Sequence, residues 1–192
     1  MTRWFTADLH FGHANIIRYC DRPWPDVDAM DRGLIDRWNA TVTDDDEVWV
    51  LGDVAMGRID ESLRLIDELR GAKLLVPGNH DRCWPGRGDS AAEWIGRYRD
   101  AGFADVLPEV VELTVGGIAV RACHFPYWGD SHDDERFAAH RPVDDGRPLL
   151  HGHVHTRWRV EDHQVNVGCD VWDYRPVSDD EIARALAELT PP

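Results

Sequence analysis

The sequence lacks an apolar run long enough to cross a membrane, and its start lacks the apolar stretch and small-residue cleavage site of a secretory signal. Cysteine is also scarce. The four cysteines are scattered and form no Cys-x-x-Cys pair, which argues against a thiolate zinc cluster and favours free thiols in a reducing compartment. We therefore expect a cytoplasmic protein that does not interact with membranes.

Positive charge is the second shortage. Lysine and arginine together number 21 against 36 aspartates and glutamates, which gives a formal net charge of −15. This balance argues against a long basic surface, so we do not expect duplex nucleic acid as a partner. A phosphate-binding site remains compatible with it, because bound metal cations can supply positive charge while carboxylates serve as their ligands.

The first half of the chain alternates predicted strands and helices. Short apolar runs at 3–7, 47–51 and 73–76 predict strands, and apolar residues at helical spacing predict helices at 27–39 and 59–69. Such alternation is typical of a parallel sheet with covering helices. No linker or internal repeat divides the 192 residues, so we expect one domain over residues 1–192.

The second half is predicted to be largely antiparallel. Ser178 and Glu181 form a capping box before a last helix that runs to Leu189. Apolar runs that flank turn signals predict strands at 110–115, 118–122, 149–150, 157–160 and 164–167. A parallel half followed by an antiparallel half predicts an α/β fold in which two mixed β-sheets pack face to face with flanking helices.

Polar side chains follow the ends of several of these strands. Ligands bind at the carboxyl ends of strands in open α/β sheets, so a fold that gathers these ends would bring the side chains into one crevice. Taken singly, each cluster is also typical of a turn or a surface segment. The clusters are Asp8-Leu9-His10, Gly52-Asp53, Gly78-Asn79-His80-Asp81, His124 and Gly152-His153-Val154-His155.

Together these side chains offer too many nitrogen and oxygen ligands for one metal ion. They suit two ions with an aspartate between them, an arrangement that can clamp both oxygens of an in-line displacement at phosphorus. His153 and His155 stand two residues apart, so on a strand they would share a face. The sequence thus predicts a two-metal site that acts on a phosphate ester.

The ordered set resembles the calcineurin-like metallophosphoesterase superfamily, whose motifs read Asp-x-His, Gly-Asp, Gly-Asn-His-Asp/Glu, a His, and Gly-His-x-His. All of them are present between Asp8 and His155. The stretches 130–146 and 166–178 also look like a bacterial and phage branch of small, single-domain members. The resemblance implies a four-layer αββα sandwich and a metal-dependent phosphodiesterase or phosphatase.

The resemblance also assigns roles. His80 would protonate the leaving oxygen or stabilise the phosphoryl charge, Asp81 would orient His80 through a hydrogen bond, and a metal-bridging hydroxide would attack. Manganese is the expected cofactor; iron, zinc, nickel or cobalt also suit such ligands. The implied metal ligands are Asp8, His10 and His155 for one ion, Asn79, His124 and His153 for the other, and Asp53 for both.

One position departs from the pattern of the superfamily. Many members carry a second aspartate after Gly-Asp, in the run Gly-Asp-x-x-Asp-Arg-Gly, where this chain has Met56. A group that assists the catalytic histidine is therefore missing or comes from elsewhere. Because the chain is also short for a protein phosphatase, a phosphoprotein substrate is disfavoured.

Two more residues are predicted to bind substrate. His13 follows the first motif and Arg82 follows the third, so either could reach a phosphate oxygen. The alternatives are a helix cap for His13 and a solvated guanidinium for Arg82. The segment 125–147 has no periodicity and could bind substrate or only anchor itself; its candidate contacts are Tyr127, Trp128, His132, Arg136 and Arg141.

Three functions are compatible with these residues. The leading one is hydrolysis of a small nucleotide-type phosphodiester or phosphomonoester, because a small substrate suits the acidic surface. The second is a nuclease or end-processing phosphoesterase on single-stranded or terminal nucleic acid. Its groove would need Arg82, Arg97, Arg99, Arg136 and Arg141. The third is a non-catalytic interaction module, which would be expected to have lost some ligands or His80.

Overall fold

The computed structural model describes residues 1–133 and 136–189 of the chain. Its strands form two five-stranded mixed sheets, which confirms the predicted α/β class with two mixed sheets and flanking helices. No helix among the described residues is long and apolar enough to cross a membrane.

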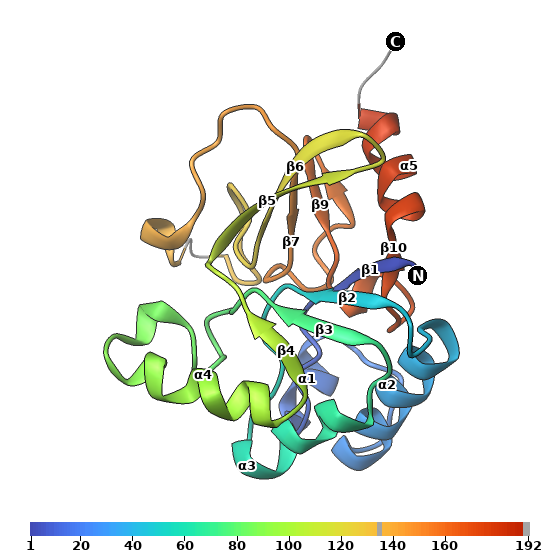
Figure 1. Cartoon of the computed structure of the whole chain (residues 1–192), viewed down its shortest axis with the longest axis vertical. Coiled ribbons are helices and arrows are strands. Elements are labelled where there is room, and N and C mark those ends of the chain that lie inside the picture. Colours follow the sequence, from blue (N-terminus) through green and yellow to red (C-terminus); the bar gives the residue numbers. More distant parts are fainter. Residues whose placement is uncertain (134–135, 190–192) are drawn as a thin grey trace.

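The first sheet carries the parallel half of the chain, in the order β10-β1-β2-β3-β4. Four strands run parallel, and β10 pairs antiparallel with β1. In Figure 1 the helices α1 to α4 lie on the face turned away from the second sheet. The elements are β1 Arg3–Thr6, α1 Ala14–Tyr19, α2 Val27–Thr41, β2 Glu47–Val50, α3 Ile59–Ser62, β3 Ala72–Leu75, α4 Ser90–Asp100, β4 Phe103–Val106 and β10 Val177–Ser178.

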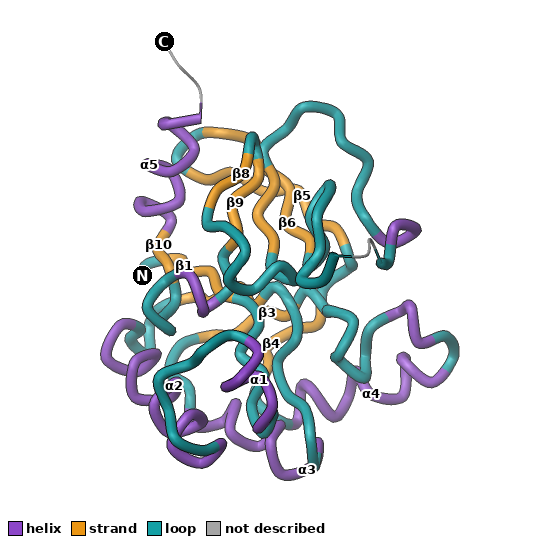
Figure 2. The backbone as a smooth tube through the Cα atoms, turned by 180° about the vertical axis from the view of Figure 1, so that it is seen from behind, coloured by secondary structure: helices purple, strands orange, loops and turns teal. Residues whose placement is uncertain are grey.

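The second sheet has the order β5-β6-β7-β9-β8. The pairs β5–β6 and β8–β9 are antiparallel, whereas β7 runs parallel to both of its neighbours. Helix α5 contacts β1, β5, β9 and β10, so it lies beside both sheets, as Figure 2 shows from behind. The elements are β5 Val110–Val115, β6 Ile118–Cys123, β7 Leu149–His151, β8 Val160–Glu161, β9 Gln164–Asn166 and α5 Asp179–Leu189.

Two apolar clusters hold these layers together. Phe5, Leu51 and Val76 of the first sheet region are buried with Val120 and Leu150 of the second, so this cluster fills the space between the sheets. The other cluster lies between the first sheet and its helices, and it includes Met30, Leu34, Ile35, Trp38, Val48, Val50 and Leu75. Burial of apolar surface on both faces explains why these strands read as continuous apolar runs.

Several elements differ from the sequence prediction. The helix expected over 59–69 is one α-helical turn followed by a 3₁₀ helix at Leu63–Glu68, which suits the three-residue spacing of Leu63, Ile66 and Leu69. The strand expected at 157–160 shortens to β8. Helices α1 and α4 and strand β4 were not predicted, since their short or strongly polar sequences show no clear period.

The predicted start of the last helix is confirmed. The Glu181 carboxylate accepts hydrogen bonds from the Ser178 backbone N–H and hydroxyl, at 3.0 and 2.8 Å, and the Glu181 N–H donates to the Ser178 hydroxyl at 3.3 Å. This reciprocal pair satisfies N–H groups that a helix start leaves free. It fixes α5 at the end of β10.

Candidate metal centre

Predicted ligands from both sheets meet where the carboxyl ends of the strands come together. Asp8 follows β1, Asp53 follows β2, and His124 follows β6. One ligand atom from each of Asp8, His10, Asp53 and His155 lies within 4.8 Å of the other three, and all but His155 are buried. This buried cluster could hold a metal ion.

The backbone at these positions adopts a conformation that L-residues rarely take. Such left-handed conformations cost about 1–3 kcal/mol each and persist where the surrounding structure enforces them, which is typical of functional sites. Ten non-glycine residues in the described part of the chain have a positive φ, and five of them are predicted metal ligands. These five are Asp8 (57°), His10 (55°), Asp53 (56°), His153 (71°) and His155 (50°).

A second group of candidate ligands lies on the other side of Asp53. His124 Nε2 lies 3.5 Å from Asp53 Oδ2 and 3.1 Å from Asn79 Oδ1, while its Nδ1 lies 2.8 Å from the Leu51 carbonyl oxygen. Because a carbonyl only accepts, Nδ1 carries a proton, and in a neutral ring Nε2 then presents a lone pair. The Asp53 oxygen, the Asn79 oxygen and this lone pair of His124 then lie close together with no proton between them. A cation would stabilise such a group.

The protonation states also suit a metal. Burial lowers the pKa of His155 to about 4 and holds the pKa of His10 well below its usual range, so both rings are neutral at pH 7. His10 Nε2 lies 3.2 Å from His155 Nε2. Burial, and then the nearby Asp53 charge, raises the pKa of Asp8. Neutral imidazoles and carboxylates in this proportion fit a divalent cation.

Glycines of the motifs make room for the carboxylates. A Cβ atom on Gly78 would lie 2.4 Å from Asp53 Oδ1, and one on Gly152 would lie 2.7 Å from Asp8 Oδ2. Neither distance is possible between non-bonded atoms. The motif glycines are therefore required because the backbone approaches the carboxylates closely, rather than for turn formation alone.

His80 differs from the candidate ligands because its side chain is 38% exposed. Its Nε2 lies 3.9 Å from Asp53 Oδ2, and its backbone N–H donates to Asp53 Oδ1 at 2.9 Å. It stands at a hollow of about 250 Å³ that opens onto the cluster. The hollow is lined by His10, His13, Ile16, Tyr19, Asp53, Met56, Asn79, His80, Ser131, His132, Arg136, His153 and His155.

The chain is similar to known proteins over most of its length. It is 35% identical to the gene 66 protein of Mycobacterium phage L5, over 93% of this chain and 91% of the relative. It is 40% identical to MJ1445 of Methanocaldococcus jannaschii, over 94% of this chain and 88% of the relative. The chain belongs to the gene 66 family. No family model matches it.

A solved structure supports the fold of this gene 66 family member. AQ665 of Aquifex aeolicus, a protein of unknown function, matches with a TM-score of 0.70 and 24% identity, over 96% of this chain and 98% of the other. An archaeal phosphodiesterase matches at a TM-score of 0.42 and 15% identity, over 88% and 82% of the two chains.

Asp81 has other partners than the His80 ring in this structure. Its buried carboxylate accepts hydrogen bonds from the backbone N–H groups of Asp53, Val54 and Gly78 at 2.8–3.1 Å, and from the Tyr98 hydroxyl at 3.2 Å. Among the described residues, these contacts do not include the predicted hydrogen bond to His80. Asp81 instead fixes the loop that carries Asp53, a role that depends on tertiary neighbours.

A buried ion pair that the sequence did not indicate supports the first motif. Arg22 donates to both oxygens of Asp170 at 2.8 and 2.9 Å, and both side chains are fully buried. Its Nη2 also donates to the Asp8 carbonyl oxygen at 2.7 Å, and its Nη1 donates to the Leu9 carbonyl oxygen at 2.9 Å. The pair therefore holds the left-handed turn that aims Asp8 and His10 at the cluster.

Removal of one partner should destabilise the protein strongly. Arg22→Met leaves the Asp170 charge buried and unpaired, which costs about 3–5 kcal/mol of unfolding free energy. Urea unfolding of the metal-free protein measures this loss. The double change Arg22→Met with Asp170→Leu removes both charges and should recover part of it. A single variant within about 1 kcal/mol of wild type would contradict the structural role.

The expected substrate-binding residues divide between two hollows. His13 lines the hollow of the cluster, and although it precedes α1, its side chain makes no capping hydrogen bond. Arg82 lines a neighbouring hollow of about 220 Å³ with His80, and its guanidinium lies 5.5 Å from the Trp94 ring centroid. Both residues remain candidates for substrate binding.

The groove that a nuclease would need is only partly present. Arg136 lines the hollow of the cluster, but Arg97 and Arg99 pair with Asp60 and Asp105 at 3.3 and 2.6 Å. Those two guanidinium groups already have carboxylate partners, and neither lines the hollow. The hollow thus includes Arg136, whereas Arg82 lines the neighbouring one.

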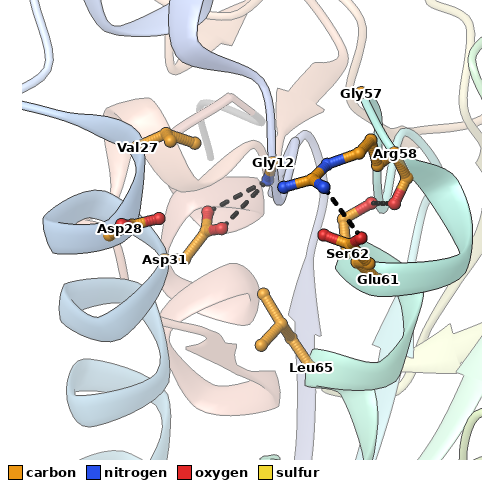
Figure 3. Close-up of a pocket in the computed structure, with 9 residues that line it drawn as sticks. All are labelled: Gly12, Val27, Asp28, Asp31, Gly57, Arg58, Glu61, Ser62 and Leu65. Carbon is orange, nitrogen blue, oxygen red and sulfur yellow. Dashed lines mark hydrogen bonds and ion pairs between the residues drawn. The ribbon is translucent and has the colours of Figure 1, made fainter.

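A larger hollow lies elsewhere, and Figure 3 shows it. It has a volume of about 410 Å³ and contains none of the candidate ligands. Several of its polar groups already pair with one another: both Asp31 oxygens accept from the Gly12 N–H at 3.1 Å, and Arg58 pairs with Glu61 at 3.0 Å. Burial raises the pKa of Asp31 to about 6. Volume alone therefore does not identify the functional site.

Proposed function

We propose that this protein is a dinuclear metal-dependent phosphoesterase that hydrolyses a small nucleotide-type phosphodiester or phosphomonoester. The observation that carries the proposal is the meeting of buried carboxylate, imidazole and amide ligands around Asp53, with the more exposed His80 beside them. A structural site would be closed by protein ligands, whereas this cluster opens into a hollow of about 250 Å³.

Two groups of residues would hold the ions, with Asp53 shared between them. Asp8, His10 and His155 would complete one site, and Asn79, His124 and His153 the other. Manganese suits this mixture of oxygen and imidazole ligands, although iron, zinc, cobalt and nickel accept the same donors. When bound, two such ions acidify water and stabilise negative charge on a phosphoryl group.

The remaining steps belong to side chains of the chain itself. His13, which follows the first motif, and Arg136, which lies in the long segment after β6, both line the hollow and would contact the phosphate ester. His80 stands at the hollow with a side chain that is 38% exposed, and it would deliver a proton to the leaving oxygen. Asp81 and Arg87 position this loop, since Arg87 donates to the carbonyl oxygens of Asp81 and Asn79 at 2.8 and 2.9 Å.

The cysteines, the size of the hollow and the paired arginines indicate a compartment and a class of substrate. All four cysteines are free and buried, which suits a reducing compartment such as the cytoplasm. A small substrate fits a hollow of this size, and the paired state of Arg97 and Arg99 argues against a polynucleotide. We propose small phosphate esters, rather than nucleic acids or membranes, as the partners.

Hydrolysis of two chromogenic esters tests the proposal. The metal-stripped protein should hydrolyse p-nitrophenyl phosphate, bis-p-nitrophenyl phosphate or both after manganese is added, and a chelator should abolish the activity. The faster ester assigns monoester or diester preference. If manganese binds but neither ester nor a panel of nucleotides is hydrolysed, the phosphoesterase proposal fails and a non-catalytic module is favoured.

A further inference from the structure

A buried carboxylate from the long segment after β6 reaches the candidate metal centre. Asp130 was not among the predicted ligands, yet its side chain is only 1% exposed. Its Oδ2 lies 3.1 Å from His153 Nε2. Such a position is unusual for a loop aspartate, because burial of a carboxylate is costly unless it is paired.

Asp130 is held in this position by its own segment. Arg136 donates to Asp130 Oδ1 from Nη2 at 2.7 Å and from Nε at 3.2 Å, and its backbone N–H donates to Oδ2 at 3.1 Å. The His132 N–H donates to Oδ1 at 3.2 Å, and an Arg141 nitrogen lies 3.9 Å from Oδ2.

The surroundings of His153 leave Asp130 as the natural partner for one ring nitrogen. The ring is enclosed by those of Phe125, Phe137 and His124, with centroids 5.1, 5.6 and 5.2 Å away. Among the described residues, Nε2 has no aligned hydrogen-bond partner, and Asp130 Oδ2 lies 3.1 Å from it. Because an ionised carboxylate only accepts, this position favours a proton on Nε2.

We propose that Asp130 is a positioning residue of the metal centre: it holds the His153 proton on Nε2 and so presents Nδ1 as the metal ligand. This inference rests on the proposed function, because it assumes that His153 binds an ion. A metal-bound histidine commonly donates its second nitrogen to a carboxylate, which fixes the tautomer and makes the ligand more basic. Here the carboxylate comes from a segment remote in sequence from His153.

The arrangement couples the long segment to the metal centre. Ser131, His132 and Arg136 line the hollow, and the hydrogen bonds to Asp130 place Arg136 there with a guanidinium that is 40% exposed. The Asp130 carboxylate therefore orients both the proposed metal ligand His153 and the proposed substrate contact Arg136. A metal at the His153 site should consequently stabilise this segment, and changes at Asp130 should weaken that metal.

Manganese binding to the full chain, measured by calorimetry, tests the inference. We expect Asp130→Asn to weaken one of two manganese sites by about 10–100-fold and to leave the other unchanged. Asp145→Asn is the matched control, because Asp145 lies on the same segment and pairs with Arg121 and Arg147 but is remote from His153. It should bind both ions as wild type does. The absorption band of bound cobalt should change in Asp130→Asn only.

The outcomes separate the two proposals. If wild type binds two ions and Asp130→Asn binds both equally well, Asp130 only anchors its segment and the inference fails while the proposed function stands. If wild type binds fewer than two ions, the dinuclear proposal fails and takes the inference with it. The melting temperature of metal-free Asp130→Asn, compared with those of wild type and Asp145→Asn, guards against misfolding: an unchanged value shows that weaker manganese binding is not a loss of fold.

Discussion

Asp53→Asn is expected to lower kcat by about 10³-fold or more and to reduce the binding of both metal ions. Asp53 Oδ2 lies 3.8 Å from His10 Nε2 and 3.5 Å from His124 Nε2, so one carboxylate serves both groups of candidate ligands. An amide has nearly the same shape but no charge, and the loss of about 4 kcal/mol of electrostatic stabilisation corresponds to this factor.

The measurement pairs metal content with turnover. Metal per chain by mass spectrometry, kcat on the better chromogenic ester, and the melting temperature of the metal-free protein are compared for Asp53→Asn and wild type. Asp60→Asn is the control, since Asp60 is an exposed acid that pairs only with Arg97 among the described residues. An Asp53→Asn protein that holds two ions and keeps wild-type kcat would contradict the shared role.

His80→Ala is expected to lower kcat by about 10²–10⁴-fold while both metal ions stay bound, because general acid catalysis contributes an effect of that size. Its side chain is 38% exposed and is not needed to complete the buried cluster. The backbone N–H that donates to Asp53 is retained in alanine. The melting temperature should therefore change little.

A comparison of leaving groups distinguishes proton donation from other roles of His80. Departure of p-nitrophenolate needs little protonation, whereas a phenyl or alkyl leaving group needs it strongly. The loss in His80→Ala should thus be larger for the phenyl ester than for the p-nitrophenyl ester. An equal loss for both esters, or a loss of bound metal, would show that His80 is not the proton donor.

Much of the candidate site was visible in the sequence because each part has a local signal. An apolar strand ends, a glycine permits close approach, and a polar side chain follows, as at Gly52-Asp53 and Gly152-His153. These signals predicted which strand ends meet, because parallel strands bring their carboxyl ends to one edge. The two mixed sheets followed from the same reading of the chain.

The parts that the sequence did not reveal depend on tertiary neighbours. Arg22 and Asp170 are 148 residues apart, and neither lies in a motif. Asp130 gains its importance only from contact with His153, and Asp81 was placed correctly in its motif but has other hydrogen-bond partners than the predicted one. A carboxylate in a loop looks the same in the sequence whether it is solvated or buried beside a histidine.

Met56 stands where the run Gly-Asp-x-x-Asp-Arg-Gly would have its second aspartate. Met56 lines the same hollow as His80 and His13, so the place of a carboxylate is taken by a flexible apolar side chain. Among the described residues, the carboxylate that His80 pairs with is that of Asp53, at 3.9 Å.

Anomalous diffraction from crystals soaked in manganese tests the central claim most directly. The account predicts two peaks about 3.5–4 Å apart with Asp53 between them. One should be surrounded by Asp8, His10 and His155, and the other by Asn79, His124 and His153. A single peak, or peaks beside Asp28, Asp31 and Glu61 in the larger hollow instead, would contradict a dinuclear centre at the strand ends.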